Sequence, residues 1–382
     1  AGKASYQILI EPVVRSTGPA IAAAAVALAA EGRNALMLVS PSDHIVGDPQ
    51  TLRNAVAVAA PAAADGAIAL FGITPDKPET GFGYIRAKMG PGAVLDVAGF
   101  IEKPKAERAV ELLKSGDCFW NSGMFLFSVA TVLEELQRYA PEVLRAAEGA
   151  VAKGRRDGNT LWLEEASFAA APPLSIDYAV MEKSSRCKVV PVSPQWSDVG
   201  SWEALWEVGL KDAAGNVAKG DTMLHQTRNT LVDAGSERLV AVLGVDDLIV
   251  VDTADAVLVM SREKSQDVKS IVTALDKAAR SESRHHRRKR RSWGSEEILA
   301  AGHGSSTERV VVVAGHSANI EGGRHRVVVT LSGRGKLTAG KVTSALAAGA
   351  SHAVDGEAFS VSADANGDLD LLLVSWQAGA GR

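Results

Sequence analysis

Four stretches in the first half of the chain combine carboxylates, glycines, an amide and a lysine in patterns that suit ligand binding. They are 41–44 (PSDH), 79–85 (ETGFGYI), 102–104 (EKP) with 121–125 (NSGMF), and 175–183 (SIDYAVMEK) with 196–202 (WSDVGSW). Carboxylates hold hard cations, amides hold hydroxyls, and glycines let the backbone approach a ligand. The chemistry these residues could do is therefore metal-assisted binding of a polar ligand.

Two aspartates are candidates for the metal. Asp43 follows an apolar strand-like run, where its hard carboxylate would suit Mg²⁺, which usually also keeps waters and phosphate oxygens. From that residue alone, a cap of the next turn or helix is the favoured alternative. Asp198, beside Gly200, is the candidate for a second metal carboxylate.

The glycine-rich and lysine-containing stretches offer candidates for the ligand. Gly83 allows close approach and Tyr84 offers a stacking face, although a plain glycine turn explains both equally well. Glu102 and Lys103 are neighbours, and neighbours on a strand face opposite ways. Both can reach one site only if the strand bends, as the following proline suggests. Asn121 could bind a hydroxyl or make an Asx turn.

The elements that must position these residues alternate between strands and helices. Apolar runs at 35–39 and 67–71 predict buried strands, and 51–64 predicts a helix between them. This alternation indicates an α/β fold with a mostly parallel sheet covered on both faces. Ligands bind such sheets beyond the carboxyl ends of the strands, where 42–44 would lie.

The rest of the chain has a different pattern. Short strands separated by Gly/Asp turns fill 215–259, and a helix is expected over 266–279. A run at 284–291 (RHHRRKRR) is strongly basic, and the chain from 295 onward is predicted to be a small β-sandwich or barrel. The predicted divisions are 1–213, 214–279, a linker at 280–294, and 295–382.

Composition excludes several classes of protein. The 382 residues carry a net charge of −4, and 46% are hydrophobic, which argues against a polyanion binder and against wholesale disorder. Cys118 and Cys187 are too few for a disulfide framework and favour a cytoplasmic location. No apolar run approaches the roughly 20 residues of a membrane span. The basic run is interpreted as a solvated linker rather than a nucleic-acid site.

Taken in order, the stretches resemble the mannose-1-phosphate guanylyltransferases, in particular the bacterial type that also carries a mannose-6-phosphate isomerase half. Besides the four groups above, 10–21 (IEPVVRSTGPAI), 238–242 (RLVAV), 251–256 (VDTADA) and 266–269 (QDVK) fit the resemblance. It implies a Rossmann-like nucleotidyltransferase sheet, a short β segment and a C-terminal cupin-like barrel.

The resemblance also implies an activity and a site. The family transfers GMP from GTP to mannose 1-phosphate and releases pyrophosphate, with Mg²⁺ as cofactor. Asp43 and Asp198 would then hold the metal, so the resemblance reverses the preference for a cap at Asp43. Glu102 would bind sugar hydroxyls and Lys103 the sugar phosphate. The mannose pocket would be lined by Gly83, Tyr84, Asn121 and Asp177. GTP and mannose 1-phosphate are the expected partners, nucleic acid and membrane are not, and a homo-oligomer is compatible with the sequence.

The chain departs from the family pattern in two places. The Gly-rich phosphate loop that opens the family does not precede Gln7, so these 382 residues are expected to turn over GTP weakly or not at all. The His-rich metal site of the isomerase half is reduced to His325 and a possible Glu321, so no isomerase activity is expected. The alternative to an enzyme is a protein that binds sugar phosphate or GDP-mannose without turnover.

Overall fold

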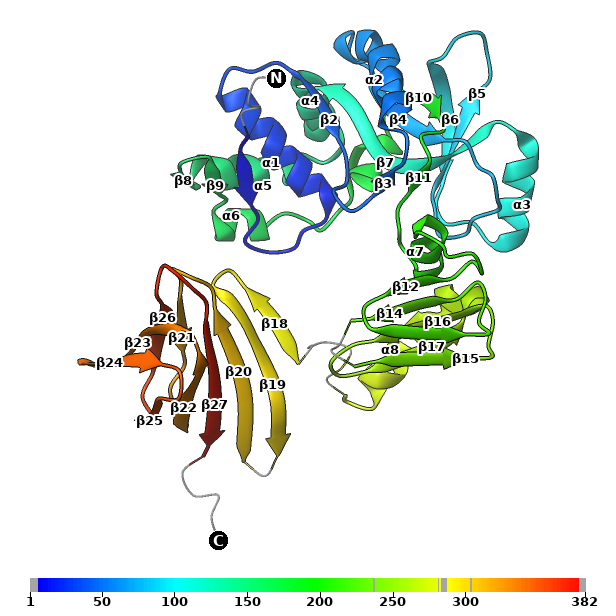
Figure 1. The fold of residues 1–382 in the computed structure, drawn as a ribbon. Coiled ribbons are helices and arrows are strands. Elements are labelled where there is room, and N and C mark those ends of the chain that lie inside the picture. The colour runs from blue at the N-terminus through cyan, green and yellow to red at the C-terminus, as the bar shows by residue number, and fades with distance from the viewer. Residues whose placement is uncertain (1–5, 236–237, 281, 283–286, 303, 378–382) are drawn as a thin grey trace. The chain divides into compact units, whose positions relative to one another are not determined.

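The computed structural model describes residues 6–235, 238–280, 282, 287–302 and 304–377. The chain divides into two compact units, 1–200 and 201–382 (Figure 1). The predicted site residues all lie in the first unit.

A six-stranded sheet organises the first unit. Its strands, in spatial order, are β2 (Leu36–Val39), β7 (Cys118–Ser128), β4 (Ile68–Ile73), β10 (Cys187–Val192), β6 (Leu95–Ile101) and β5 (Tyr84–Lys88). Among the described strands of this sheet, only β4 and β10 pair in parallel, so the prediction of a mostly parallel sheet is wrong. The long strand β7 causes much of the difference, because it lies between β2 and β4 and runs against both.

Helices cover both faces of this sheet, as predicted. One core packs α1 (Thr17–Ala30), α4 (Val129–Tyr139) and α5 (Pro141–Ala152) against one face, and a second packs α2 (Pro49–Ala64) and α3 (Ala106–Ser115) against the other. The helix expected at 51–64 is α2. It begins after Asp48, whose side chain accepts hydrogen bonds from the backbone N–H of Gln50 and Thr51.

Smaller elements complete the first unit. The strands β1 (Ile8–Ile10), β9 (Thr160–Trp162) and β8 (Arg155–Asp157) form a separate sheet, followed by α6 (Glu165–Ala169). The short strands β3 (Ile45–Val46) and β11 (Trp196–Ser197) pair antiparallel. A single π-helical turn, η1 (Asp177–Met181), precedes β10.

The second unit begins with α7 (Trp202–Val208) and a set of short strands. One sheet has four strands, in the spatial order β12 (Val217–Lys219), β14 (Leu231–Ala234), β16 (Leu248–Asp252) and β17 (Val257–Ser261). A separate two-stranded sheet consists of β13 (Thr222–His225) and β15 (Val240–Leu243). Parallel ladders link β12 to β14, β14 to β16 and β13 to β15. The turn η2 (Arg262–Asp267) and helix α8 (Val268–Lys277) follow, in agreement with the helix predicted at 266–279.

The C-terminal part is an eight-stranded jelly roll. Its strands are β20 (Ser305–Val312), β21 (Ser317–Ile320), β22 (His325–Ser332), β23 (Arg334–Ala339), β24 (Val342–Ala347), β25 (Ser351–Asp355), β26 (Phe359–Ala363) and β27 (Leu369–Trp376). They form sheets ordered β20-β27-β22-β25 and β21-β26-β23-β24, which share one apolar core. This order is that of the double-sheet jelly rolls to which cupins belong, and it confirms the predicted cupin-like fold.

The basic run does not behave wholly as a linker. Residues 284–286 lie outside the described residues, but β18 (Arg288–Arg291) pairs antiparallel with β19 (Gly294–Gly302). These two strands extend the first jelly-roll sheet, with β18 at its edge. The interpretation of the whole run as linker is corrected for this part, because Arg288–Arg291 forms a regular ladder with the strand that follows.

Candidate active site

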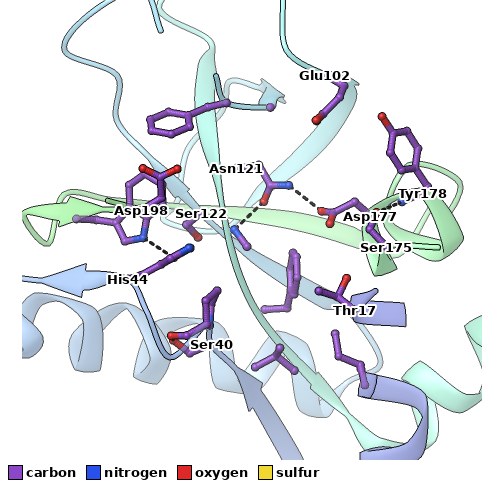
Figure 2. A pocket seen from close by; sticks show the side chains of 18 of the residues that line it. Thr17, Ser40, His44, Glu102, Asn121, Ser122, Ser175, Asp177, Tyr178 and Asp198 are labelled. Carbon is purple, nitrogen blue, oxygen red and sulfur yellow. Dashed lines mark hydrogen bonds between the residues drawn. The ribbon is translucent and has the colours of Figure 1, made fainter. Parts of the chain in front are cut away.

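One pocket in the first unit gathers most of the predicted site residues. Its volume is about 550 Å³, within the range of small-molecule sites. The segments that line it come from α1, the end of β2, the loop before β5, the end of β6, β7, η1 and β11, and Figure 2 shows their side chains converging. The polar and charged side chains among them are Thr17, Ser40, His44, Glu102, Lys103, Asn121, Ser122, Ser175, Asp177, Tyr178 and Asp198.

A bulge in β7 presents Asn121 to the pocket. Gly72 of β4 pairs with Asn121, whereas Leu70 pairs with Phe125, so β7 carries extra residues between these two pairs. Gly123, at φ 69°, lies within this bulge. Asn121 was expected on a turn, but it lies on a strand that the bulge bends at this point.

Asn121 and Asp177 form the hydrogen-bonded centre of one side of the pocket. The Asn121 amide Nδ2 donates to Asp177 Oδ1 at 2.7 Å, and the Asn121 side-chain oxygen accepts from the Gly123 N–H at 3.1 Å. Burial raises the pKa of Asp177 despite the Asn121 hydrogen bond, and the Glu102 carboxylate raises it further. A ligand hydroxyl that donates to this carboxylate would favour its charged form.

Glu102 and Lys103 both reach the pocket, and the backbone shows how. Lys103 has φ 40°, so the chain turns sharply at the end of β6, and its ammonium lies 3.3 Å from Glu102 Oε1. This is the bend that the sequence required. Gly83 makes room for the glutamate, because a Cβ at that position would lie 2.7 Å from Glu102 Oε2.

The other side of the pocket is formed by His44 and Asp198 (Figure 2). Trp196 also lines the pocket. The Trp196 indole N–H donates to His44 Nδ1 at 3.2 Å, and the rings meet edge to face with centroids 5.3 Å apart. Asp198 Oδ1 accepts from the Gly200 N–H at 3.0 Å, which leaves its other oxygen for a ligand. Trp196 therefore lines the site and also packs against the core on the α2 and α3 side of the sheet.

Asp43 lies beside this group but does not line the pocket. The antiparallel pairing of Ser197 with Ile45 brings the segments that carry Asp198 and Asp43 side by side. The Asp43 side chain is exposed there, while its neighbour His44 faces the cavity. Two carboxylates on paired segments suit a divalent cation that takes its remaining ligands from water and phosphate.

Tyr84, like Asp43, is a predicted site residue that does not line the pocket. Its side chain is fully buried in the core beneath α2 and α3, and its hydroxyl donates to the Glu79 carbonyl at 2.9 Å. It therefore has no free face on which a ligand could stack. Phe82, two residues earlier, lines the pocket instead and packs edge to face against Trp120 and Trp196.

Three further lining residues were not singled out from the sequence: Thr17, Ser175 and Tyr178. The Thr17 hydroxyl accepts a hydrogen bond from the Ile176 N–H at 3.0 Å, which ties the start of α1 to the segment before η1. All three lie inside stretches that the sequence analysis named, and this position was the only sequence signal that could have identified them as site residues.

Among the described residues, neither the pocket of the first unit nor the jelly roll brings together three His, Cys, Asp or Glu side chains that could hold a metal ion. His325 instead has its Nδ1 3.1 Å from Asp355 Oδ1, and its ring stacks on Trp376.

Comparison with known proteins decides the family. The nucleotidyl transferase family model matches residues 2–215, more than half of the chain, and covers every residue of the pocket. The chain belongs to the nucleotidyl transferase family. A second model, the MannoseP isomerase/GMP-like β-helix domain, matches residues 220–275 of this nucleotidyl transferase, which include the parallel ladders β13–β15 and β14–β16.

Curated relatives share most of the chain. The nucleotidyl transferase is 43% identical over 336 residues to the alginate biosynthesis protein AlgA of Pseudomonas putida, covering 87% of this chain and 69% of the relative. It is 42% identical over 345 residues to mannose-1-phosphate guanylyltransferase of Escherichia coli, covering 88% and 72%. A Thermus thermophilus structure titled mannose-1-phosphate geranyltransferase matches with a TM-score of 0.61 and 36% identity, over 70% of this chain and 77% of that one.

Two general features complete the description of this nucleotidyl transferase. Among the helices of the described residues, none has the length and apolar character needed to cross a membrane. Cys118 and Cys187 are both free and buried.

Proposed function

We propose that the pocket binds mannose 1-phosphate and that the protein acts as a mannose-1-phosphate guanylyltransferase, forming GDP-mannose and pyrophosphate from GTP. The observation that carries this proposal is the division of one 550 Å³ pocket into two sides. One side holds the hydroxyl-binding groups Glu102, Asn121 and Asp177, and the other holds Asp198. A sugar phosphate needs both kinds of contact.

The chain's own residues would orient the reaction rather than form covalent bonds. Asn121 and Asp177 would hold the sugar hydroxyls, and the Lys103 ammonium would hold the sugar phosphate beside the nucleotide. An oxygen of that phosphate then attacks the α-phosphorus of GTP, one P–O bond forms, and the bond to the leaving pyrophosphate breaks. Positioning and charge neutralisation supply the catalysis in such transfers.

Mg²⁺ is the cofactor that we assign, with Asp198 and Asp43 as its protein ligands. The fit rests on the donor set, since both groups are hard carboxylates on paired segments and Asp198 faces the cavity. Mg²⁺ commonly uses one or two carboxylates and completes its shell with water and substrate phosphates. When bound it neutralises charge on the phosphates.

The second candidate is a binding protein without turnover. Both candidates use the same sugar-phosphate pocket and differ only in pyrophosphate release. The two free, buried cysteines support a reducing, cytoplasmic location for either one.

One calorimetric and one enzymatic measurement test these proposals. We expect mannose 1-phosphate to bind with Mg²⁺ and to bind at least about tenfold more weakly in EDTA. Asp198→Asn keeps an acceptor for the Gly200 N–H but removes the charge, so it should remove most of the Mg²⁺ dependence. Asp157→Asn, an exposed aspartate far along the chain, should change nothing.

The outcomes separate the assignments. Unchanged Mg²⁺ dependence in Asp198→Asn means that the metal assignment is wrong. Binding without pyrophosphate release from GTP supports the binding protein, and pyrophosphate release that depends on mannose 1-phosphate supports the enzyme. No binding at all removes both.

A further inference from the structure

His44 lies in the wall of the transferase pocket, which is the 550 Å³ pocket of the first unit. It directly precedes β3, and the antiparallel ladder of β3 with β11 holds it beside Trp196. A Cβ on Gly123 would lie 4.0 Å from His44 Cε1, so the imidazole reaches across to the bulge of β7. The ring therefore lies between segments that are far apart in the sequence.

One hydrogen bond determines which nitrogen of the neutral His44 ring carries the proton. The Trp196 indole N–H donates to His44 Nδ1 at 3.2 Å, which is the dashed line at His44 in Figure 2. An indole nitrogen can only donate, so Nδ1 must be the acceptor. In the neutral imidazole the other nitrogen is then the donor, and the proton lies on Nε2.

Aromatic packing holds the indole that makes this hydrogen bond. The Trp196 ring meets the His44 ring at an interplanar angle of 79°, and its centroid lies 5.3 Å from that of Phe82. Phe82 in turn packs edge to face against the buried Trp120, with centroids 5.2 Å apart. Edge-to-face contacts restrict how aromatic rings are oriented. The chain therefore sets the direction and the tautomer of His44 before a ligand binds.

The Nε2–H of His44 is available to a ligand. In the part of the chain that the structure describes, no hydrogen bond to Nε2 is formed, although His44 lines the pocket. Asp198 lies on the same side of the pocket, and Asp43 precedes His44 in the chain. Ionised carboxylates only accept hydrogen bonds. The Nε2–H is thus an uncharged donor near two acceptors, and it suits a ligand group that is rich in acceptor oxygens.

We propose that His44 is a further binding residue of this pocket, which donates its Nε2–H to a phosphate oxygen of the bound sugar phosphate, and that Trp196 positions this donor. The inference rests on the proposed function, because it takes mannose 1-phosphate as the ligand. A hydrogen bond to a charged phosphate is stronger than one between neutral groups. Because the tautomer is set in advance, binding does not have to select it.

The neutral character of this donor fits its position. Asp198 and Asp43 are the carboxylates that we assign to Mg²⁺, and a cationic side chain beside them would be attracted to the same carboxylates. A neutral N–H contacts the phosphate without adding such a competing charge. The imidazole would therefore help to hold the phosphate while the carboxylates remain available to the metal.

Two amide substitutions of different length test the role of His44. The His44→Asn amide ends near the position of Nδ1, where it can still accept from Trp196, but it does not reach the ligand. The longer His44→Gln amide places an N–H near the position of Nε2. In calorimetry on the full chain with mannose 1-phosphate and Mg²⁺, we expect His44→Asn to bind at least about tenfold more weakly and His44→Gln to bind within about threefold of the parent.

A purely structural role for His44 predicts the opposite order, because only the Trp196 hydrogen bond would then matter. Equal affinity in the parent and in His44→Asn would therefore overturn the inference while mannose 1-phosphate binding still stood. If the parent chain does not bind mannose 1-phosphate at all, the proposed function fails as well. His225→Asn, at an exposed position on β13, is the matched control and should change the affinity less than twofold.

The tautomer itself can be measured without any ligand. In the full chain labelled with ¹⁵N-histidine, NMR distinguishes a protonated from an unprotonated ring nitrogen, and the signal of His44 is the one lost in His44→Gln. We expect the Nε2–H tautomer in the parent chain, and both tautomers in Trp196→Phe, which keeps an aromatic ring but removes the indole N–H. Trp196→Phe should also weaken mannose 1-phosphate binding about threefold.

This measurement separates positioning from packing. If Trp196 only fills space, the phenylalanine variant keeps the parent's tautomer, and its positioning role is wrong. An Nδ1–H tautomer in the parent chain would overturn the assignment of the donor. Circular dichroism checks that each variant is folded, and the tautomer in the parent chain decides the point even if a variant is not.

Discussion

Gly83 has no side chain, and the Glu102 carboxylate occupies the space beside it. A Cβ at position 83 would lie 2.7 Å from Glu102 Oε2, so the flexible end of the glutamate side chain would have to move. We expect Gly83→Ala to displace the glutamate and to weaken mannose 1-phosphate binding about tenfold, since a charged hydrogen bond is lost. Calorimetry measures the affinity.

Gly81→Ala is the matched control for that substitution. Gly81 also lines the pocket, but a Cβ there would lie 3.5 Å from its nearest neighbour, an ordinary contact. We expect it to bind mannose 1-phosphate nearly as the parent chain does. Equal losses of affinity for mannose 1-phosphate in both variants would show that the loop backbone, and not the position of the Glu102 side chain, controls binding.

The residue types predicted most of the site, but they did not predict the direction in which each side chain points. Glu102, Lys103 and Asn121 were singled out by residue type and Asp177 by the family resemblance, and all four line one pocket. Tyr84 was chosen for its aromatic face, yet its ring is buried. A glycine-rich stretch has no regular periodicity, so the sequence does not reveal which of its aromatic rings faces the cavity.

At the scale of elements, Asp117 ties together three pieces of the first unit. It lies between α3 and β7 and accepts hydrogen bonds from the Ser115 hydroxyl and from Arg86 Nε of β5, the latter at 2.8 Å. The Ser115 hydrogen bond, followed by that of Arg86, lowers the pKa of Asp117 to about 2.

This lowered pKa gives a stability that depends on pH. A carboxylate with a folded pKa below its unfolded value stabilises the fold above the unfolded pKa, and this contribution is lost as pH falls through the folded pKa. We expect Asp117→Asn to reduce the free energy of unfolding by about 1 kcal/mol at pH 7, after allowance for solvent screening.

Urea unfolding at several pH values measures this effect. The difference between the two proteins should shrink between pH 4 and pH 2, whereas Asp157→Asn, at an exposed position, should show little difference at either pH. If the difference in free energy of unfolding stays constant down to pH 2, the destabilisation by Asp117→Asn comes from changed geometry and not from the lost charge.

Strand positions were predicted far better than strand directions. The apolar runs at 35–39 and 67–71 became β2 and β4, and the expected helix between them is α2. Their direction relative to neighbours depends on β7, which inserts between them from much later in the chain. Local apolar patterns contain no information about such a long-range pairing.

At the scale of the whole molecule, we expect the transferase pocket and the C-terminal jelly roll to differ in activity. We expect no interconversion of mannose 6-phosphate and fructose 6-phosphate after incubation with Zn²⁺, because a catalytic zinc needs about three protein ligands. The described residues bring no such group together, and His325 is already engaged by Asp355 and Trp376. A coupled assay measures this activity, and turnover above that of the heat-inactivated chain would contradict the expectation.

The predicted divisions of the chain were placed where its composition changes sharply. The shift to short strands separated by Gly/Asp turns, and then to an all-β pattern, marked the β segment and the jelly roll before any pairing was known. The basic run was harder, because charge alone does not distinguish a solvated connector from a solvated strand. Backbone pairing with β19 decided this for Arg288–Arg291.

The position of β18 at the end of its sheet has a consequence for how copies of this protein meet. An edge strand exposes unpaired backbone N–H and C=O groups, which can pair with an extended segment of another chain and so lead to aggregation. Here that strand is made of arginines and a lysine, with Arg288, Arg290 and Arg291 exposed. Two such edges carry like charge and repel each other, so Arg288–Arg291 disfavour edge-to-edge pairing of two copies through β18.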